Sequence, residues 1–496
     1  MASIQTRNSV LAIVKETTEG TPKAPTLASQ YIALQDNFEL SPNFDNLENS
    51  ELRASIGRSK SITGTESPSA SLSHYFRASG VEGQAPGYGL LLEASLGSES
   101  VASTEYDTVS GSTTSLIKVG VGEGANFSRG QSLLIKDATN GYRVRFVDSV
   151  ATDDLALSFV TPVATPAAVN LGRSVCYKPA NDSHPTLTLW HYLGQGGALQ
   201  AMAGSRVTSA SFDISAGELI NASYSLEGVG YYFDPIEVVA GSNVIHFDIG
   251  GSPLSATIPA QLYKTPIELA DAVATGMTAA AGTTIGCTYS NTLGKYAVTK
   301  ASGTLAIDWA SWANSIGATM GFTADDTGAL AYTSDVALDF SSPQNPSFDS
   351  ADPLAAKDNE VMLGTQDEYA CFKASTVNMT IDTPKADIPS VCAASGKIGS
   401  IIQSREVTIT VSALLEQYDA KQFERFRNGT EVKFQYTAGQ KSGGNWIAGK
   451  VAALYSPTAT ISAFSVSDAD GLAQLDLELK AFVNANGEGE VYVAFN

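Results

Sequence analysis

PTLTLWHYLGQGG (residues 185–197), followed by VTSASFDISAGELINASYSLEG (207–228), sets the pattern of this chain. The pattern occurs again as EVKFQYTAGQKSGG (431–444) and ATISAFSVSDADGLAQLDLELK (459–480). In both passages an alternating strand ends in a glycine-rich turn, and a second alternating strand then turns at a glycine into a third. A fixed order of strands and turns that occurs twice indicates a duplicated unit.

The repeat continues upstream. PSASLSHYF (68–76) and EVTITVSALL (406–415) are alternating strands, and each precedes a short helical run that ends on glycine, the usual residue at a helix stop. The matching helical runs and first strands lie at 87–97 with 416–429 and at 31–40 with 369–381. Each half therefore reads strand, long polar loop, strand, helix and three further strands.

The two copies differ in length. The second copy passes directly from its helix into the next strand, whereas the first copy inserts residues 98–184 at that point. The predicted fold class is mainly β, with two tandem β-sandwich domains that each have one flanking helix, a small all-β insert and a small α+β insert. The predicted domains are the first sandwich at 1–97 and 185–235, the β insert at 98–184, the α+β insert at 236–350 and the second sandwich at 351–496.

Composition and charge narrow the functional classes. The chain has 496 residues, of which 43% are hydrophobic and 16% charged, a balance typical of several globular domains. Its 30 Lys and Arg against 51 Asp and Glu give a net charge of -21, which disfavours binding to nucleic acid or an anionic membrane. The apolar run near residue 10 is too short for a signal peptide or a membrane span, so we expect folding in the cytoplasm where the chain is made.

Two segments near the N-terminus have little core of their own. Residues 1–30 hold a brief strand at 10–14 and then a Thr-, Pro- and Gly-rich run, which is typical of an arm that lies on another part of the molecule. Residues 41–67 form a connection long enough to be disordered or to bind a partner. Its charges are segregated, which leaves open both a solvated loop and a head-to-tail contact with an identical neighbour. The acidic residues are Asp45, Glu48 and Glu51, and the basic residues are Arg53, Arg58 and Lys60.

The two inserts differ in their sequence patterns. Residues 98–184 contain short alternating strands separated by Gly, Asn-Gly and Asp-Asp, which predicts a small antiparallel barrel or sandwich. The GVGEG run there lacks the spacing of a nucleotide loop, so a turn is favoured. In 236–350, Thr265 is the expected cap of a helix, Pro266 its first residue and Glu268 the partner in a capping box. Residues 341–353 read as a linker back into the second copy.

The sequence predicts no catalytic, cofactor-binding or metal site, and therefore no enzyme. No G-x-S-x-G, H-E-x-x-H or P-loop occurs, and SDADG (467–471) lacks the later acidic ligand of a calcium loop, which favours a hairpin turn. A site assembled only in three dimensions stays open. The histidines and cysteines are scattered without metal-ligand spacing, and the cysteines are expected as reduced thiols. They are His74, His184, His191, His246, Cys176, Cys287, Cys371 and Cys392.

Four blocks of the sequence carry a family resemblance. They are KETTEGTPKAP, YIALQDNFELSPNFDNLENSELRASIGRSKSITG, PSASLSHYFRASGVEGQAPGYGLLLEASLG and PTLTLWHYLG. Together they resemble the major tail tube proteins of long flexible-tailed, siphovirus-like bacteriophages, well over 1–97 and 185–233 and more weakly over 369–496. The resemblance implies tube domains whose sheets join neighbours into rings with a β-barrel as inner wall. The rings stack into a hollow virion tail tube that conducts DNA to the host.

The resemblance and the duplication together imply an assembly. A typical family member has one tube domain and closes as a hexamer, so two fused domains predict a homotrimeric ring with pseudo-sixfold symmetry. An acidic wall would let DNA pass without specific binding, and Asp476 and Glu478 are candidate lumen residues, with outside solvent as an equal alternative. The long loop is expected to contact the next ring, and the inserts to project outward. The implied partners are the chain itself, a tape-measure protein and tail-tip or terminator proteins.

Two other classes of protein are compatible with parts of the pattern. A bacterial surface or adhesin-like array of β domains would explain the strands, glycines and acidity, but it should carry an export signal or an anchoring segment. An acidic hydrolase with its site at a domain junction is the third reading.

Overall fold

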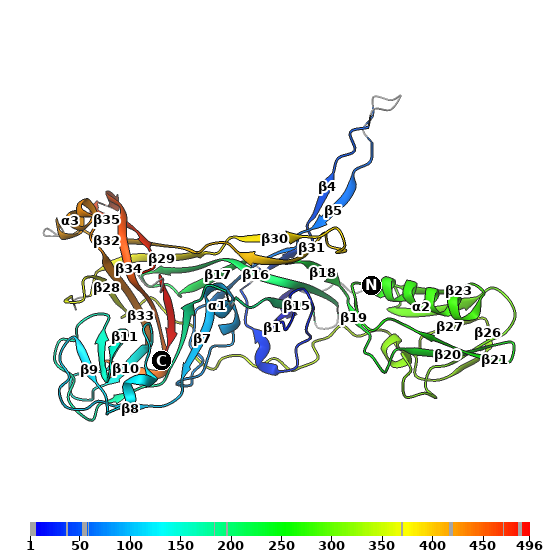
Figure 1. Cartoon of the computed structure of the whole chain (residues 1–496), viewed down its shortest axis with the longest axis horizontal. Helices are drawn as coiled ribbons and strands as arrows, with labels where there is room; N and C mark the ends of the chain where they lie inside the picture. The colour runs from blue at the N-terminus through cyan, green and yellow to red at the C-terminus, as the bar shows by residue number, and fades with distance from the viewer. Residues whose placement is uncertain are drawn as a thin grey trace.

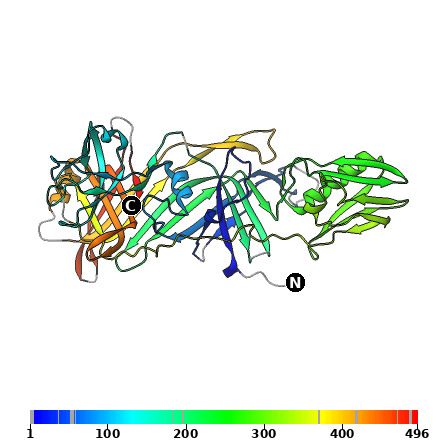
Figure 2. The same ribbon diagram turned by 90° about the horizontal axis from the view of Figure 1, so that it is seen from below.

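The chain is mainly β and consists of two tandem β-sandwiches with two small inserts, which confirms the predicted fold class. The computed structural model describes residues 6–35, 38–51, 57, 59–182, 184–194, 197–368, 371–415, 420–469, 471–484 and 489–496. Figure 1 shows an elongated molecule, with the second sandwich and the β insert at one end and the α+β insert at the other. Seen from below in Figure 2, the first sandwich lies between them.

Eight strands form one antiparallel sheet that runs through both sandwiches, and we call it the long sheet. Its first four strands belong to the first sandwich and its last four to the second. In spatial order they are β3 (Glu39–Ser41), β6 (Ser69–Tyr75), β17 (Asn221–Glu227), the C-terminal part of β16 (Ala198–Ser215), β29 (Ala374–Asp382), β32 (Glu406–Leu414), β35 (Leu472–Ala481) and the C-terminal part of β34 (Asn445–Ala469).

A side sheet packs on each half of the long sheet. The first side sheet consists of β2 (Tyr31–Ile32), β1 (Val10–Lys15), β15 (Leu187–Leu193), the N-terminal part of β16 and β18 (Gly230–Phe233). The second consists of β28 (Glu360–Gly364), β33 (Val432–Ser442), the N-terminal part of β34, β36 (Tyr492–Phe495), β14 (Ser174–Pro179) and β7 (Gly97–Ala102). Each sandwich has one helix, α1 (Gly89–Leu96) in the first and α3 (Ala420–Asn428) in the second.

The two sandwiches follow one plan. β16 and β34 both pass from a side sheet into the long sheet, and each has a register shift just after the crossing, at Val207/Ser209 in β16 and at Ile461/Ala463 in β34. A bulge bends a strand and increases its twist, which lets one strand serve two layers. The same bulge at the same step of the same strand order supports the duplication that the sequence indicated.

The core lies between the long sheet and the side sheets. Every second residue of the long sheet points into it, including Phe212, Tyr224, Val411 and Leu477, and one apolar cluster extends through both sandwiches. The intervening residues form the opposite face of the sheet. The two sandwiches are therefore joined by a shared sheet and a shared core.

The N-terminal strand is more central than the sequence indicated. β1 lies between β2 and β15, and the four residues from Leu11 to Val14 are buried on both faces, so this part of residues 1–30 is an interior strand and not a surface arm. The strand expected at 31–40 is also two strands. β2 belongs to the first side sheet and β3 to the long sheet, because the chain changes layers between Ile32 and Glu39.

Two hairpins leave the long sheet at equivalent places, one from each sandwich. The first is β4 (Phe44–Leu47) with β5 (Ile62–Glu66), and the second is β30 (Lys385–Pro389) with β31 (Lys397–Ile402). In Figure 1, β4 and β5 stand away from the body, whereas β30 and β31 lie along the first sandwich. The connection expected at 41–67 is thus partly a hairpin.

The β insert has a six-stranded sheet and its own apolar core, as the texture of 98–184 predicts. In order its strands are β8 (Tyr106–Asp107), β13 (Asn170–Leu171), β10 (Ser132–Lys136), β11 (Arg143–Ala151), β12 (Asp154–Leu157) and β9 (Leu116–Lys118). The GVGEG run leads into a 3-10 turn, η3 (Glu123–Asn126), where the Glu123 carboxylate accepts the Gly120 N–H at 2.8 Å. β7 and β14 flank this sheet in sequence and extend the second side sheet.

The α+β insert packs the helix α2 (Pro266–Ala281) on small sheets. Its strands are β19 (Ile236–Glu237), β20 (Val244–Ile249), β21 (Ser252–Thr257), β22 (Leu262–Tyr263), β23 (Ile285–Ser290), β24 (Lys295–Lys300), β25 (Leu305–Asp308), β26 (Asp326–Ala329) and β27 (Ala331–Thr333). Thr265 caps α2 by accepting the Glu268 N–H at 3.2 Å, and Pro266 is the first helical residue, as expected. The Glu268 carboxylate accepts the N–H of Lys264 at 2.6 Å, one residue before the predicted partner.

Short 3-10 segments and a tethered linker complete the chain. The other 3-10 turns are η1 (Thr6–Asn8), η2 (Ala28–Gln30) and η4 (Gly317–Met320). The linker expected at 341–353 is held to the first sandwich, since the Ser347 N–H donates to the Ala28 carbonyl and the Gly87 N–H to the Asp349 carboxylate, both at 2.9 Å. The residue limits of the four predicted domains stay a prediction.

Candidate assembly surfaces

The face of the long sheet opposite the core is polar along its whole width. Ser and Thr dominate this face, and the strand register places these residues next to one another on neighbouring strands. Ser71 pairs with Ser225, which pairs with Ser209, and in the second sandwich Thr380 pairs with Thr408. Such a face offers hydroxyl groups to water and few apolar contacts. The sequence alternation alone could not say that both halves turn this face the same way.

Charges on the polar face are mainly acidic. In the first half, the strands carry Glu39, Asp213 and Glu227 against Arg206, so three acids and one base give the strands a net charge of -2, and Lys385 of β30 pairs with Glu227 at 3.3 Å. In the second half, the strands carry Asp382, Glu406, Asp476 and Glu478 against Lys480, so four acids and one base give -3. Both cations of these strands have a carboxylate partner: Arg206 pairs with Glu19 at 2.8 Å and Lys480 with Glu406 at 2.5 Å. The face therefore presents excess negative charge.

The structure puts Asp476 and Glu478 on this polar face, on the strand next to the edge. Hydroxyl groups of Ser467 and Ser412 donate to the Asp476 carboxylate and lower its pKa, so this group stays ionised at neutral pH. Glu478 accepts from the Ser462 hydroxyl at 3.0 Å. Both side chains lie on the side of β35 away from Leu475, Leu477 and Leu479, as the alternation predicts.

A closed seam joins the two sandwiches. β16 of the first sandwich pairs with β29 of the second over Ser209–Ser215 and Thr376–Asp382. The Ser209 hydroxyl donates to the Asp382 carboxylate at 2.7 Å, and the Asn378 amide donates to the Asp213 carboxylate. Beneath this pairing Phe212 is fully buried, with its ring 5.4 Å from that of Phe76.

Charged groups close the same seam on the helix side. The Arg405 guanidinium, at the start of β32, donates at 3.0 Å to the carbonyl of Leu96, the last residue of α1, where a cation complements the helix dipole. It also pairs with the buried Glu490 carboxylate at 3.4 Å. His184 lies beside it, with its two ring nitrogens 3.0 and 3.1 Å from the Ala94 and Ala180 carbonyls. Arg405 of the second sandwich thus caps the C-terminus of α1 in the first sandwich.

An open seam lies at each end of the long sheet. At one end, residues 462–469 of β34 pair with β35 on one side and have no partner strand on the other within the described part of the chain. At the other end, the outer side of β3 is equally without a partner strand there. Val466, the counterpart of Phe212 in β34, is 52% exposed. An exposed strand edge is a template for pairing with another chain.

The pairing partners define which residues of the two seams correspond. Phe212 faces Ala222 in β17 and Val466 faces Leu475 in β35, and both lie five residues after the residue that precedes the bulge. Likewise Leu40 in β3 faces Ala70 in β6, where Met379 in β29 faces Ile409 in β32. Phe212 pairs with Met379 across the closed seam. Val466 and Leu40 are therefore the residues on the two open edges that correspond to this pair.

The two hairpins differ in what they contact. β30 and β31 lie on the first sandwich, where the Ser400 hydroxyl donates to Glu19 at 2.7 Å and Arg206 donates to Ser400 at 2.8 Å. β4 and β5 instead expose Phe44, Leu47 and Ile62. An apolar group of this kind on a projecting hairpin indicates a contact with another molecule.

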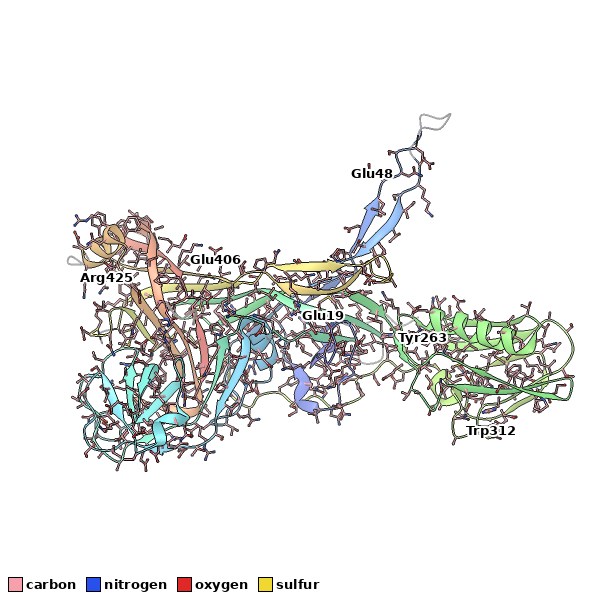
Figure 3. The ribbon with its side chains drawn as sticks, viewed as in Figure 1. Glu19, Glu48, Tyr263, Trp312, Glu406 and Arg425 are labelled. Carbon is pink, nitrogen blue, oxygen red and sulfur yellow. The ribbon has the colours of Figure 1, made fainter. Side chains whose placement is uncertain are left out.

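The predicted loop residues lie on this projecting hairpin in part. Asp45 is in β4, Glu48 and Glu51 follow it, and Lys60 precedes β5. Figure 3 shows Glu48 high on the projecting hairpin, far from the body. Arg53 and Arg58 lie outside the described residues. Four of the six therefore lie in the described part of this hairpin segment, and their inter-ring role stays a prediction.

Sequence reasoning missed the apolar part of the open seam. Phe423 and Phe426 of α3 pack on Phe464 of β34, with ring centroids 5.5 and 6.2 Å apart. Both helix residues remain exposed at the end of the molecule, where Figure 3 labels Arg425 on the same helix. The i, i+3 spacing of the two phenylalanines, which puts them on one helix face, was the signal available in the sequence.

The histidines and cysteines do not form a reactive site. His74 is buried, and burial lowers its pKa to about 4. All four cysteines are free thiols, Cys371 and Cys392 exposed, Cys176 and Cys287 buried. In the described ranges, no three His, Cys, Asp or Glu side chains are grouped so that they could hold a metal ion. No helix there is long and apolar enough to cross a membrane.

Comparison with known proteins gives a family match. Residues 6–345, more than half of the chain, match the family model described as phage tail tube protein. Two solved structures are similar to parts of the chain. One is the virion of a native gene transfer agent particle, with 12% identity over 24% of this chain and 89% of that chain and a TM-score of 0.19. The other is a hybrid NMR and cryo-EM structure of the SPP1 tail tube, with 14% identity over 28% and 77% and a TM-score of 0.20. A search of curated protein sequences found no match.

Proposed function

The chain belongs to the phage tail tube protein family, and from this premise we propose that three copies close head to tail into a ring of the tube. It is a non-enzymatic structural protein of the virion. Stacked rings would form the conduit through which DNA leaves the capsid for the host.

The closed seam is the observation that carries the ring. Inside one chain, β16 of one sandwich already pairs with β29 of the next sandwich of the same plan. The open edges of β34 and β3 hold the corresponding places, and one is at each end of the long sheet. If each chain joins the next through the junction seen inside one chain, every chain adds two sandwiches to the ring. Three chains of eight strands then supply 24 strands to the inner wall, and closure leaves no free edge.

The internal register specifies the register between chains. We propose antiparallel pairing of residues 463–468 of β34 with residues 38–43 of the next chain, Val466 opposite Leu40. Ser465 then faces Ser41 and Ser467 faces Glu39, in the positions of Ser211 with Thr380 and Asp213 with Asn378. Core-side residues meet core-side residues in this register. A shift by one residue would place Leu40 on the polar face.

The polar face of the long sheet is proposed as the wall of the bore. The side chains of its strands alone carry -2 and -3 in the two halves, which is -5 per chain and -15 per ring of three chains. Excess carboxylates repel the phosphates of DNA and keep a layer of water and counterions, so DNA slides without being held. Asp476 and Glu478 are the proposed lumen residues on β35.

The projecting hairpin is proposed as the contact between rings. Its exposed Phe44, Leu47 and Ile62 supply apolar area, and Asp45, Glu48, Glu51 and Lys60, with Arg53 and Arg58, supply charges of both signs. Segregated charges and an apolar face are better matched by a fixed neighbour in the stack than by water. A tape-measure protein in the bore and terminator or tail-tip proteins at the tube ends are the further partners proposed, with folding in the host cytoplasm before assembly.

The symmetry of the tube tests this proposal. Purified protein, or tails from the phage, would be imaged by electron cryomicroscopy and the number of chains per ring counted in the reconstruction. We expect three chains with two similar sandwiches each, with β34 beside β3 of the next chain. Rings with true sixfold symmetry, or rings joined through other edges, would contradict the trimer.

A further inference from the structure

Helix α1 is covered on both sides at the closed seam. It packs on β16, and on its other side it meets strands of the second side sheet. The ring of Tyr88, the residue before α1, lies 6.2 Å from that of Phe495, the last residue of β36, and a Cβ at Gly89 would meet the Tyr177 ring of β14. Phe495 is 2% exposed. The helix of one sandwich is therefore closed by the edge of the neighbouring side sheet.

Helix α3 has the first of these contacts and lacks the second. It packs on β34, as α1 packs on β16, through Phe423 and Phe426 against Phe464. Phe423 is nevertheless 44% exposed, whereas Leu91 and Leu92 of α1 are fully buried. An exposed aromatic ring contributes little to the stability of a surface helix, so Phe423 is a candidate contact with another molecule. The outer face of α3 is the one part of the helix plan that the single chain leaves uncovered in its described residues.

Phe233 holds the place in the first sandwich that Val493 holds in the second. Phe233 pairs with Gln200 and Val493 with Leu454, and these two residues lie seven positions before Val207 and Ile461, where the matching bulges begin. Val493 packs into the shared core and is fully buried, and Phe495, two residues later, lies beside the ring of Tyr88. Phe233 is 43% exposed. It borders a pocket of about 400 Å³ between β18 and the α+β insert, whose other apolar lining includes Pro266, Ile267, Tyr289 and Phe340.

We propose that α3 of one chain packs on Phe233 of the next chain, with Phe423 and Phe426 directed to this pocket. The inference rests on the head-to-tail ring proposed above and names a contact that the ring alone does not require. The partner must be a second copy, because α3 and β18 lie well apart on one chain (Figure 1). The α+β insert, so far expected only to project outward, then becomes part of the joint between chains.

Charge agrees with this occupant. Residues 236–350 contain ten Asp and Glu and three Lys, a net charge of -7. Helix α3 contains Lys421, Arg425 and Arg427 against Glu424, a net charge of +2. Lys421 and Arg425 pair with Glu368 of their own chain, so the helix together with this partner keeps a net charge of +1, which is opposite in sign to that of the insert.

A chemical cross-link tests the contact. Phe233 and Phe423 would both be replaced by Cys in a chain in which Cys371→Ser and Cys392→Ser remove the exposed thiols, and assembled tubes would be treated with a short bis-maleimide. We expect covalent dimers and trimers on a denaturing gel and no longer product. The control pairs Phe233→Cys with Val121→Cys, a fully exposed position on the β insert that should give no dimer.

The outcomes separate this inference from the ring itself. Trimeric rings without cross-links would overturn the contact and leave the proposed function intact, whereas a ladder up to six chains would support the contact and overturn the trimer. A second variant, Phe423→Ser with Phe426→Ser, covers the case in which the cysteines block assembly. It should unfold at the same urea concentration as the parent chain but need at least about tenfold more protein to assemble. Assembly at the parent concentration would refute the contact.

Discussion

The closed seam inside the chain can be compared with the open seam at its ends, which we propose forms the same junction between chains. At the closed seam Phe212 is buried, Arg405 caps α1 and β30 with β31 lies on the neighbouring sandwich. At the open seam Val466 and α3 are exposed, and β4 with β5 projects from the body (Figure 1). β29 has nine residues and two partner strands, whereas β3 has three residues and, among the described parts of the chain, one partner strand. The strand that is paired on both sides is the longer one, and the closed seam is the template for the junction that we propose between chains.

The single variants Phe212→Asp and Val466→Asp should show the largest difference between the closed and the open seam. Phe212→Asp removes a buried aromatic ring, which alone costs about 3–5 kcal/mol of unfolding free energy, and buries a carboxylate without a partner, so most of the fold's stability should be lost. Val466→Asp should change the unfolding free energy by less than about 0.5 kcal/mol, because the site is half exposed. It should still prevent ring formation. Urea unfolding and negative-stain microscopy measure the two effects, and ring formation by Val466→Asp at the parent concentration would contradict the proposed edge.

The free hairpin should matter for stacking and not for ring closure. In the triple variant Phe44→Ser, Leu47→Ser, Ile62→Ser we expect isolated rings and tubes at least about tenfold shorter, since the apolar contact to the next ring is lost. Arg53→Glu with Arg58→Glu should impair polymerisation in the same way. Tube lengths in micrographs give the measurement. The matched control, Val121→Ser, Val163→Ser, Val239→Ser, changes three exposed apolar residues on the inserts and should leave tube length unaltered.

Acid should weaken the first sandwich through His74, with the smallest of these effects. Burial lowers the pKa of His74 to about 4, while the unfolded chain titrates near 6.5. The unfolded chain therefore binds more protons between these values, and stability that is complete above pH 6.5 is lost as the pH falls toward 4, by about 2 kcal/mol at pH 5. The corresponding position of the second sandwich is Ala413, which faces Leu475 as His74 faces Ala222 and cannot titrate. His74→Gln should flatten the dependence of urea unfolding on pH, and an unchanged slope would exclude His74 as its source.

Local patterns in the sequence predicted much of the architecture. The alternation in 207–228 and 459–480 identified β16 with β17 and β34 with β35, and Thr265 with Pro266 marked the start of α2, because these signals span only a few residues. Asp476 and Glu478 were correctly separated from Leu475, Leu477 and Leu479 by the same period of two. The central position of β1 was not predictable in this way, since it depends on pairing with β15, more than 170 residues further along the chain.

The sequence by itself determined that one unit occurs twice, that it is built of strands with one helix, and that the surface is acidic, because repetition, periodicity and charge are properties of the linear chain. Only the tertiary structure decided which edges are closed and which are open, that β7 and β14 extend the second side sheet, and that Phe233 is exposed where its counterpart Val493 is buried. These features arise from hydrogen bonds and packing between segments far apart in the sequence. No local pattern encodes which distant strand completes an edge, so the partner of an open edge becomes visible only beside its closed counterpart.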